Sequence, residues 1–179
     1  MSSDNLPTIV LLTAALLAAL TAWLGPAARP FTVLTLVLTA SAGLWVAGAG
    51  PFPPPGSAER LVVVLLAAAL AVVGGGPVTM QVFRLAAGPG GADSSVAEAG
   101  EILRGGAWVG ALERAAIAVA LIAGWPEGLA LALAVKGLGR YPELRNQENA
   151  GTAERFLIGT FTSVLWAVGC AGIALLFLG

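Results

Sequence analysis

Glu113 and Arg114 are adjacent charged residues in an otherwise apolar stretch, residues 105–124, that is long enough to cross a membrane. A charged side chain at the centre of such a helix costs roughly 2.5–3.5 kcal/mol on insertion scales, so it needs a partner and indicates a functional or structural site. The two residues could titrate, hold an anion through the guanidinium group, or join helices through an ion pair. Which use applies depends on the partners that the rest of the chain supplies.

Lys136 is the expected partner of Glu113. If Trp108 and Tyr141 mark the inner membrane interface on two consecutive antiparallel helices, Glu113 and Lys136 each lie five residues from it. At a rise of about 1.5 Å per residue, both side chains are then about 7–8 Å deep. Equal depth on adjacent helices predicts a Glu113–Lys136 ion pair.

Arg114 cannot share this partner, because neighbouring positions on a helix point about 100° apart. Its candidate acceptors are Glu143, Glu154, a lipid phosphate reached by the long side chain, or a bound anionic substrate. The complete candidate cluster on the cytoplasmic side consists of Glu113, Arg114, Lys136, Arg140, Glu143, Arg145, Glu154 and Arg155. The sequence is compatible both with a structural ion-pair network and with a ligand-binding site.

Several chemistries are excluded by the scarcity of Cys and His. The chain has one Cys, Cys170, and no His. An intrachain disulfide, a zinc site with the usual ligands and a His-based catalytic triad are therefore excluded. We expect no metal, no cofactor and no catalytic residue, which favours a protein that is not an enzyme.

The composition is that of an integral membrane protein. Hydrophobic residues make up 58% of the 179 residues and charged residues 11%, and the net charge of −1 gives no attraction to nucleic acid. We predict an all-α, polytopic transmembrane helix bundle forming a single domain, residues 1–179. The six predicted spans are about 7–24, 31–48, 61–82, 105–124, 127–141 and 156–178, and a cytoplasmic loop, 83–104, forms a flexible turn followed by a short helix.

Basic residues predict the orientation. Seven of them fall in the odd-numbered loops (Arg29, Arg84, Arg104, Lys136, Arg140, Arg145 and Arg155), whereas Arg60 is alone in the even-numbered ones. The positive-inside rule then makes the odd-numbered loops cytoplasmic and both termini external. The excess of Arg over Lys, with abundant Ala and Gly, indicates a GC-rich bacterial genome and hence a bacterial inner membrane.

Small residues recur at helical spacing in the last three spans. Such stripes allow close helix approach in membranes, which predicts a compact C-terminal three-helix bundle. They would equally allow docking to a second copy or to another membrane protein. The predicted helix-packing residues are Gly106, Gly110, Gly128, Ala132, Gly159, Ser163 and Ala167.

The third span is interrupted by Gly74-Gly75-Gly76-Pro77. Pro lacks the N–H that a helix interior needs, so a kink near the helix end is expected. The alternative is irregular backbone that lines a cavity, which survives at membrane depth only when it is buried in protein or faces water.

The same charged region resembles a known family. The runs 110–114, 134–145 and 154–160 hold, in order, a Glu-Arg pair, an Ala-x-Lys-x-x-x-Arg run and a Glu followed by Ile-Gly-Thr. This order is similar to the C-terminal part of a family of small multi-pass bacterial membrane proteins of unassigned function. The likeness covers roughly the last 40% of the chain. It implies a shared charge cluster, and it implies no particular activity.

Three function classes remain. The first is a non-enzymatic subunit or scaffold of a membrane assembly. The second is a small-solute or ion pathway, anion-selective or proton-coupled, in which the Glu113–Lys136 pair is a titratable gate. The third is an enzyme acting on a lipid phosphate or headgroup, with Glu113 or Glu143 as base. The expected partners are the lipid bilayer together with a second copy, a membrane-protein partner, an anionic ligand or a lipid headgroup.

Overall fold

The computed structural model describes residues 5–24, 28–48, 55–102, 106–145 and 150–179. Within these ranges the side chains of residues 87–102, 140, 142–145, 150–153 and 155 are not described. The described chain is helical, and its element order is α1 (Leu6–Leu24), α2 (Ala28–Gly48), α3 (Ser57–Ile102), α4 (Gly106–Ile122), α5 (Glu127–Arg145) and α6 (Ala150–Leu178). The all-α prediction is confirmed.

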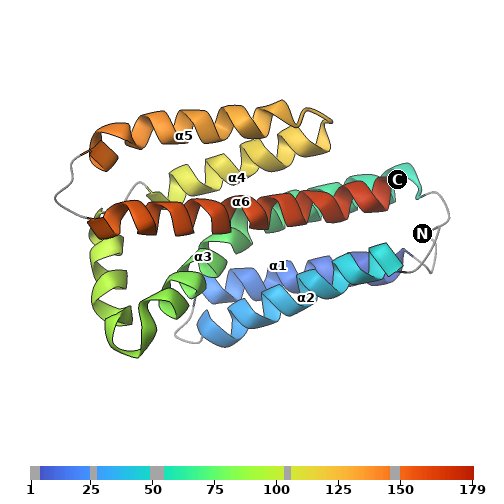
Figure 1. The fold of residues 1–179 in the computed structure, drawn as a ribbon. Coiled ribbons are helices and arrows are strands. Elements are labelled where there is room, and N and C mark those ends of the chain that lie inside the picture. Colours follow the sequence, from blue (N-terminus) through green and yellow to red (C-terminus); the bar gives the residue numbers. More distant parts are fainter. Residues whose placement is uncertain (1–4, 25–27, 49–54, 103–105, 146–149) are drawn as a thin grey trace.

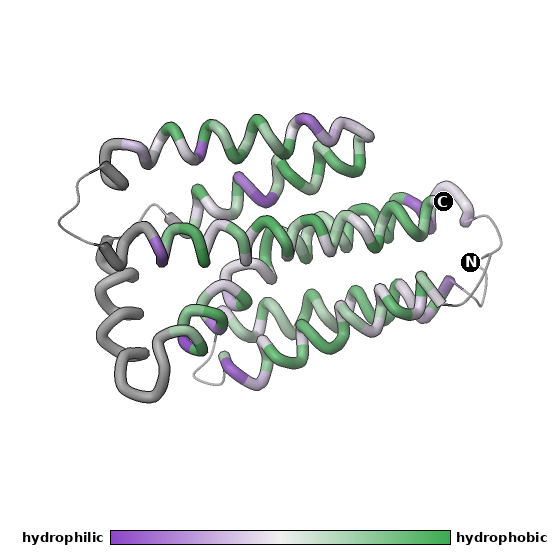
Figure 2. The backbone as a smooth tube through the Cα atoms, viewed as in Figure 1, coloured by the Kyte–Doolittle hydropathy of each residue, from purple (hydrophilic) through white to green (hydrophobic). Residues whose placement is uncertain are grey.

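Four of these helices are long and apolar enough to cross a membrane: α1, α2, the Ser57–Ala86 part of α3, and the Phe156–Leu178 part of α6. Figure 2 shows hydrophobic residues along the length of these segments, whereas α4 and α5 both contain hydrophilic positions. Helix α4 has 17 residues and α5 carries charges at Glu127 and Lys136. Four membrane-spanning helices are therefore supported directly by length and composition.

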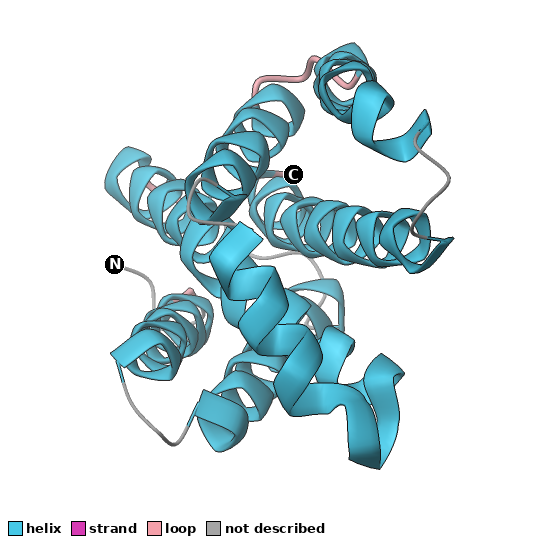
Figure 3. Ribbon diagram, turned by 90° about the vertical axis from the view of Figure 1, so that its left-hand side faces the viewer, coloured by secondary structure: helices cyan, strands magenta, loops and turns pink. Residues whose placement is uncertain are grey.

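The helices run antiparallel in three layers. Figure 1 shows α1 and α2 on one side, α3 and α6 in the middle, and the α4–α5 hairpin on the opposite side. The end-on view in Figure 3 shows the same separation of α1–α2 from α4–α5. The start of α1 and the end of α6 lie at the same end of the bundle.

The hydrophobic core lies mainly between α1, α2, α3 and α6, and α4 adds Ile117 and Ala118 to it. Its fully buried members include Leu12, Val63, Leu70 and Cys170. Many core positions are alanines, which let the helices approach closely where there is no large side chain to separate them. On α2 the buried threonines each donate to their own helix four residues back, so their hydroxyl groups need no partner elsewhere; they are Thr32, Thr35 and Thr39.

The third helix differs from the prediction at both ends. It begins at Ser57 and continues to Ile102, through most of the segment 83–104, for which a flexible turn followed by a short helix is expected. The Gly-Pro-Gly-Gly sequence at 88–91 predicts a break; the backbone is helical through this sequence, and Figure 1 shows the last part of α3 turning back sharply. At its start, the carboxylate of Glu59 accepts the backbone N–H of Gly56 at 3.3 Å, a capping contact that begins the helix before the apolar run does.

Candidate functional site

The α4–α5 hairpin carries Glu113, Arg114 and Lys136, and a Schellman turn closes it. The N–H of Trp125 donates to Ala120 O at 2.8 Å and that of Gly124 to Leu121 O at 3.0 Å. Gly124 has φ +75°, the left-handed conformation that favours glycine, and Pro126 follows. The tight turn expected here therefore returns α5 beside α4.

Arg114 is buried, with 5% of its surface exposed, and it points from α4 toward α3. Its Nε donates to Ala71 O at 3.1 Å and to Val72 O at 3.1 Å, and its Nη2 donates to Val72 O at 2.8 Å. Its Nη1 donates to Ser163 Oγ on α6 at 3.3 Å. The acceptors of this guanidinium group are thus backbone carbonyls and a hydroxyl, and they link three helices.

Two tryptophans contact the same segment of α3 in the same way. The indole N–H of Trp166 on α6 donates to Leu70 O at 3.1 Å, and that of Trp23 on α1 donates to Val73 O at 2.9 Å. Together with Arg114, they supply side-chain donors to four consecutive carbonyl groups. We call this segment the α3 socket; it consists of the carbonyls of residues 70–73 and the glycines Gly74, Gly75 and Gly76.

The glycines explain how these side chains reach the backbone. A Cβ built on Gly74 would overlap Trp166, one on Gly75 would overlap Arg114, and one on Gly76 would overlap Trp23. Pro77 contributes as well, because it has no N–H to donate to Val73 O. The three glycines therefore make room for the three donor side chains, and Pro77 leaves the Val73 carbonyl without a backbone donor. The helix α3 continues through this sequence. Figure 1 shows α3 changing direction in the middle of its length.

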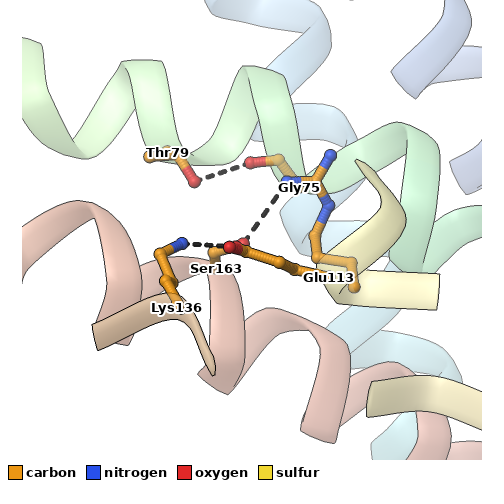
Figure 4. A network of polar contacts seen from close by, with 6 residues as sticks. Gly75, Thr79, Glu113, Lys136 and Ser163 are labelled. Atoms are coloured by element: carbon orange, nitrogen blue, oxygen red, sulfur yellow. Dashed lines mark hydrogen bonds and ion pairs between the residues drawn. The ribbon is translucent and has the colours of Figure 1, made fainter. Parts of the chain in front are cut away.

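Glu113 points from α4 toward α5. Its Oε2 accepts a hydrogen bond from Lys136 Nζ on α5, and this predicted ion pair is present. The two side chains are 17% and 18% exposed, so the pair is mostly but not fully buried. Lys136 Nζ also lies 5.9 Å from the centre of the Phe156 ring on α6, within cation–π range. Figure 4 shows Lys136 and Glu113 pointing toward each other, with Ser163 beside them.

Two buried polar atoms near this region have no hydrogen-bond partner in the described structure: Gln81 Oε1 on α3 and Thr160 Oγ1 on α6. Thr160 lies one helical turn after Phe156 and one turn before Ser163, on the face of α6 that meets Lys136 and Arg114. On α3, the Thr79 hydroxyl donates to Gly75 O at 2.7 Å, next to the socket (Figure 4). The interior is therefore more polar on this side of the socket than in the core of residues 63–71.

The rest of the predicted charge cluster is only partly described. Glu154 is exposed and is not an acceptor of Arg114. The side chains of Arg140, Glu143, Arg145 and Arg155 lie outside the described residues, so their place in the cluster stays a prediction. Among the residues that are described, no group of three or more His, Cys, Asp and Glu is placed to hold a metal ion.

The predicted packing residues have neighbours both within and outside the expected three-helix bundle. Gly128 of α5 lies against Ala120 of α4, whereas Gly159 of α6 lies against Phe83 and Thr79 of α3. Ser163 and Ala167 are buried, whereas Gly106, Gly110 and Ala132 are partly buried. Helix α4 packs on α3, α5 and α6, and α6 packs chiefly on α3. Of the expected C-terminal three-helix bundle, the α4–α5 and α4–α6 contacts are present, and the hairpin attaches to the other helices chiefly through α4.

The contacts of Trp23 and Trp166 with α3 are not predicted by the sequence. Both looked like ordinary tryptophans of apolar spans, and a donor that meets a backbone carbonyl on another helix leaves no spacing pattern. Asn5 and Glu59 were also missed. Asn5 is fully buried, and its Nδ2 donates to Glu59 Oε2 at 2.7 Å, which joins α1 to the start of α3. The signal that could have found this contact is an isolated acidic residue in the first turn of an apolar helix.

Comparisons of the chain with protein-family models, with curated proteins and with solved structures found no match. The resemblance of the C-terminal charge cluster to a family of small bacterial membrane proteins therefore stays a prediction.

Proposed function

We propose that the protein is a six-span integral membrane protein of the bacterial inner membrane, with both termini external, that acts as a non-enzymatic subunit or scaffold of a membrane assembly. The observation that carries this proposal is the hydrogen bonding of the intramembrane charges. Arg114 is directed to α3 and α6, and Glu113 is paired with Lys136 on α5. These contacts use the charges to hold helices together, which is what a scaffold requires of them.

The six-span topology is supported by the geometry of the hairpin. Helix α4 has 17 residues, which extend about 26 Å and approach the roughly 30 Å of a hydrocarbon core. Trp108 and Trp125 lie near its two ends and are both exposed, as expected of side chains at two membrane interfaces. The charges that made α4 and α5 look unsuitable as spans are paired or hydrogen-bonded within the bundle, which lowers the cost of inserting them.

The test compares Arg114→Lys with Arg29→Lys in a strain that lacks the gene. A scaffold role predicts that Arg114→Lys lowers membrane abundance, because Lys cannot reproduce the forked contacts with α3, and that complementation falls only in proportion to abundance. Arg29→Lys, at the exposed start of α2, should be silent. Normal abundance of Arg114→Lys with lost complementation would mean that the guanidinium group binds a ligand, and would contradict the scaffold proposal.

A small-solute or ion pathway is the second candidate, and the unpaired buried atoms favour it. Thr160 Oγ1 and Gln81 Oε1 are polar atoms that water or a solute would satisfy, and the nearby Glu113–Lys136 pair is partly exposed. Thr160→Val removes the hydroxyl group at nearly constant volume. A pathway predicts reduced flux, or a mutant phenotype, at normal abundance. Full complementation by Thr160→Val at normal abundance would count against the pathway.

A further inference from the structure

The α4–α5 hairpin and the four-helix core differ in their suitability for a membrane. The core helices α1, α2, α3 and α6 each contain a segment that is long and apolar enough to span alone. The hairpin carries Glu113, Arg114 and Lys136 inside its two helices and was not among those segments. Its attachment to the core runs through α4, whereas α5 packs on α4.

Arg114 is the charge that the hairpin cannot neutralise by itself. Glu113 and Lys136 are both hairpin residues and pair with each other. The hydrogen bonds of Arg114, in contrast, go to Ala71 and Val72 on α3 and to Ser163 on α6, which all belong to the core. An unpaired guanidinium group at this depth would be expensive, so the membrane position of the hairpin depends on acceptors that only an assembled core presents.

We propose that the α3 socket is the device that admits the α4–α5 hairpin to the membrane, so that the hairpin spans only while Arg114 is seated in the socket. The hairpin is then a conditional element on a permanently inserted core. This inference rests on the six-span topology of the proposed function, and its test distinguishes failure of the inference from failure of the topology.

A substitution at Gly75 disturbs the contact of Arg114 with the α3 socket without changing any charge. A Cβ at this position overlaps Cδ and Nε of Arg114. The side chain of Arg114 cannot move along α3, because Trp166 covers Gly74 and Trp23 covers Gly76. Gly75→Ala should therefore expel the guanidinium group, although Ala is a better helix former than Gly. The matched control is Gly172→Ala on α6, where an added Cβ meets nothing within 4 Å.

Cysteine labelling measures on which side of the membrane the hairpin tip, the turn between α4 and α5, lies. Cys170 is replaced by Ala, and a single Cys is placed at Ala123, which is exposed at the end of α4. The reference is a Cys at Ser57, exposed at the start of α3 and at the same end of the bundle (Figure 1). A membrane-impermeant maleimide is added to sealed vesicles of each orientation. With the wild-type socket, both positions should label from the same side.

Gly75→Ala should lower labelling of Ala123→Cys from that side by about tenfold or more, while labelling of Ser57→Cys is unchanged. Adding Arg114→Leu to Gly75→Ala should restore it, because the hairpin then carries no unseated charge. Gly172→Ala should have no effect.

Each other outcome has a definite meaning. Labelling of the wild-type tip from the opposite side would overturn the six-span topology. A wild-type result as expected, combined with unchanged tip labelling in Gly75→Ala, would overturn only the present inference. So would a loss that Arg114→Leu does not restore, or a loss that also affects Ser57→Cys, because either one would show damage to the core rather than an unseated charge.

Discussion

The tip of the Arg114 side chain carries five N–H groups, more than one carboxylate can accept. Nε–H is shared between the Ala71 and Val72 carbonyls of α3, Nη2 donates to the Val72 carbonyl, and Nη1 donates to the Ser163 hydroxyl of α6. Carbonyl oxygens carry partial negative charge, so several of them can stabilise a cation without a full counter-charge. A buried arginine in this position therefore acts as a link between helices, and its adjacent residue Glu113 is free to pair elsewhere.

The two tryptophan donors can be tested by Trp→Phe substitutions, which remove the indole N–H together with part of the ring. Trp166→Phe and Trp23→Phe each leave a carbonyl of the α3 socket without its side-chain donor, and this loss should lower the free energy of unfolding by about 0.5–1.5 kcal/mol. Trp166 is buried, whereas Trp23 is exposed, so the smaller ring should add a further loss from the space it leaves at position 166. Trp45→Phe on α2 is the control, since Trp45 is exposed and has no hydrogen bond in the described structure. Unfolding in detergent micelles measures the three variants, and equal stability of all three would show that these N–H groups contribute nothing.

Ser163 and Thr160 are similar hydroxyls on one face of α6 with opposite expected effects. Ser163→Ala removes an acceptor of Arg114 and should destabilise by about 1–3 kcal/mol, since the charged donor stays buried. Thr160→Val removes a hydroxyl without a partner and should be neutral or stabilising. The same unfolding assay compares them. A larger loss for Thr160→Val would indicate that this hydroxyl has a partner, such as a buried water.

At the scale of elements, the hairpin is a unit with its own internal ion pair. The turn at Gly124 sets α5 against α4, and Lys136 on α5 then contacts Glu113 on α4. The pair is mostly buried, so removing one partner leaves an uncompensated charge at the helix interface. Its loss should weaken the packing of α5, which has little other attachment to the bundle.

A double-mutant cycle measures this coupling. Glu113→Gln and Lys136→Met should each destabilise the folded protein by a few kcal/mol if the surviving charge stays dry, and by less if it reaches the interface. The double variant should recover much of the loss, with a coupling energy of about 0.5–3 kcal/mol. Folded protein in membranes and unfolding in micelles provide the measurement. Strictly additive losses would mean that the two residues act independently.

For the whole molecule, the antiparallel helices place the predicted cytoplasmic segments together at one end of the bundle. Arg29 lies in the first turn of α2, the basic residues of α5 lie toward its end, and α6 begins beside the end of α5. The opposite end holds the starts of α1 and α3 and the end of α6, together with the buried Asn5–Glu59 contact. Basic residues are therefore concentrated at one end of the bundle, and the positive-inside rule predicts the orientation from this difference.

Reporter fusions test this orientation. A reporter active only in the cytoplasm should be silent when fused to the C-terminus after Gly179 and active when inserted after Ile102, where α3 ends. The physical reason is the seven-to-one excess of basic residues in the odd-numbered loops and in the adjoining part of α5, where Lys136 and Arg140 lie. Activity at the C-terminus would reverse the orientation or change the parity of the spans.

Much of the architecture could be predicted from local properties of the sequence. The apolar runs predict α1, α2 and α6 closely, because a span requires only length and hydropathy. Turn chemistry at Gly124 and equal depth of Glu113 and Lys136 predict the hairpin and its ion pair, since both depend on positions close along the chain. The length of α3 differs from the prediction, because Gly and Pro at 88–91 indicate the end of a helix, whereas the helical backbone extends to Ile102.

The acceptors of Arg114 and the roles of Trp23 and Trp166 were decided only by the tertiary structure. Backbone carbonyls are present at every residue, so no letter of the sequence marks the four in the α3 socket as acceptors for side chains on three other helices. The Gly-Gly-Gly-Pro sequence indicates that the backbone there is accessible and short of one donor, but not which side chains approach it. That choice depends on how α1, α4 and α6 pack around α3, which is a property of contacts between residues 42 to 96 positions apart.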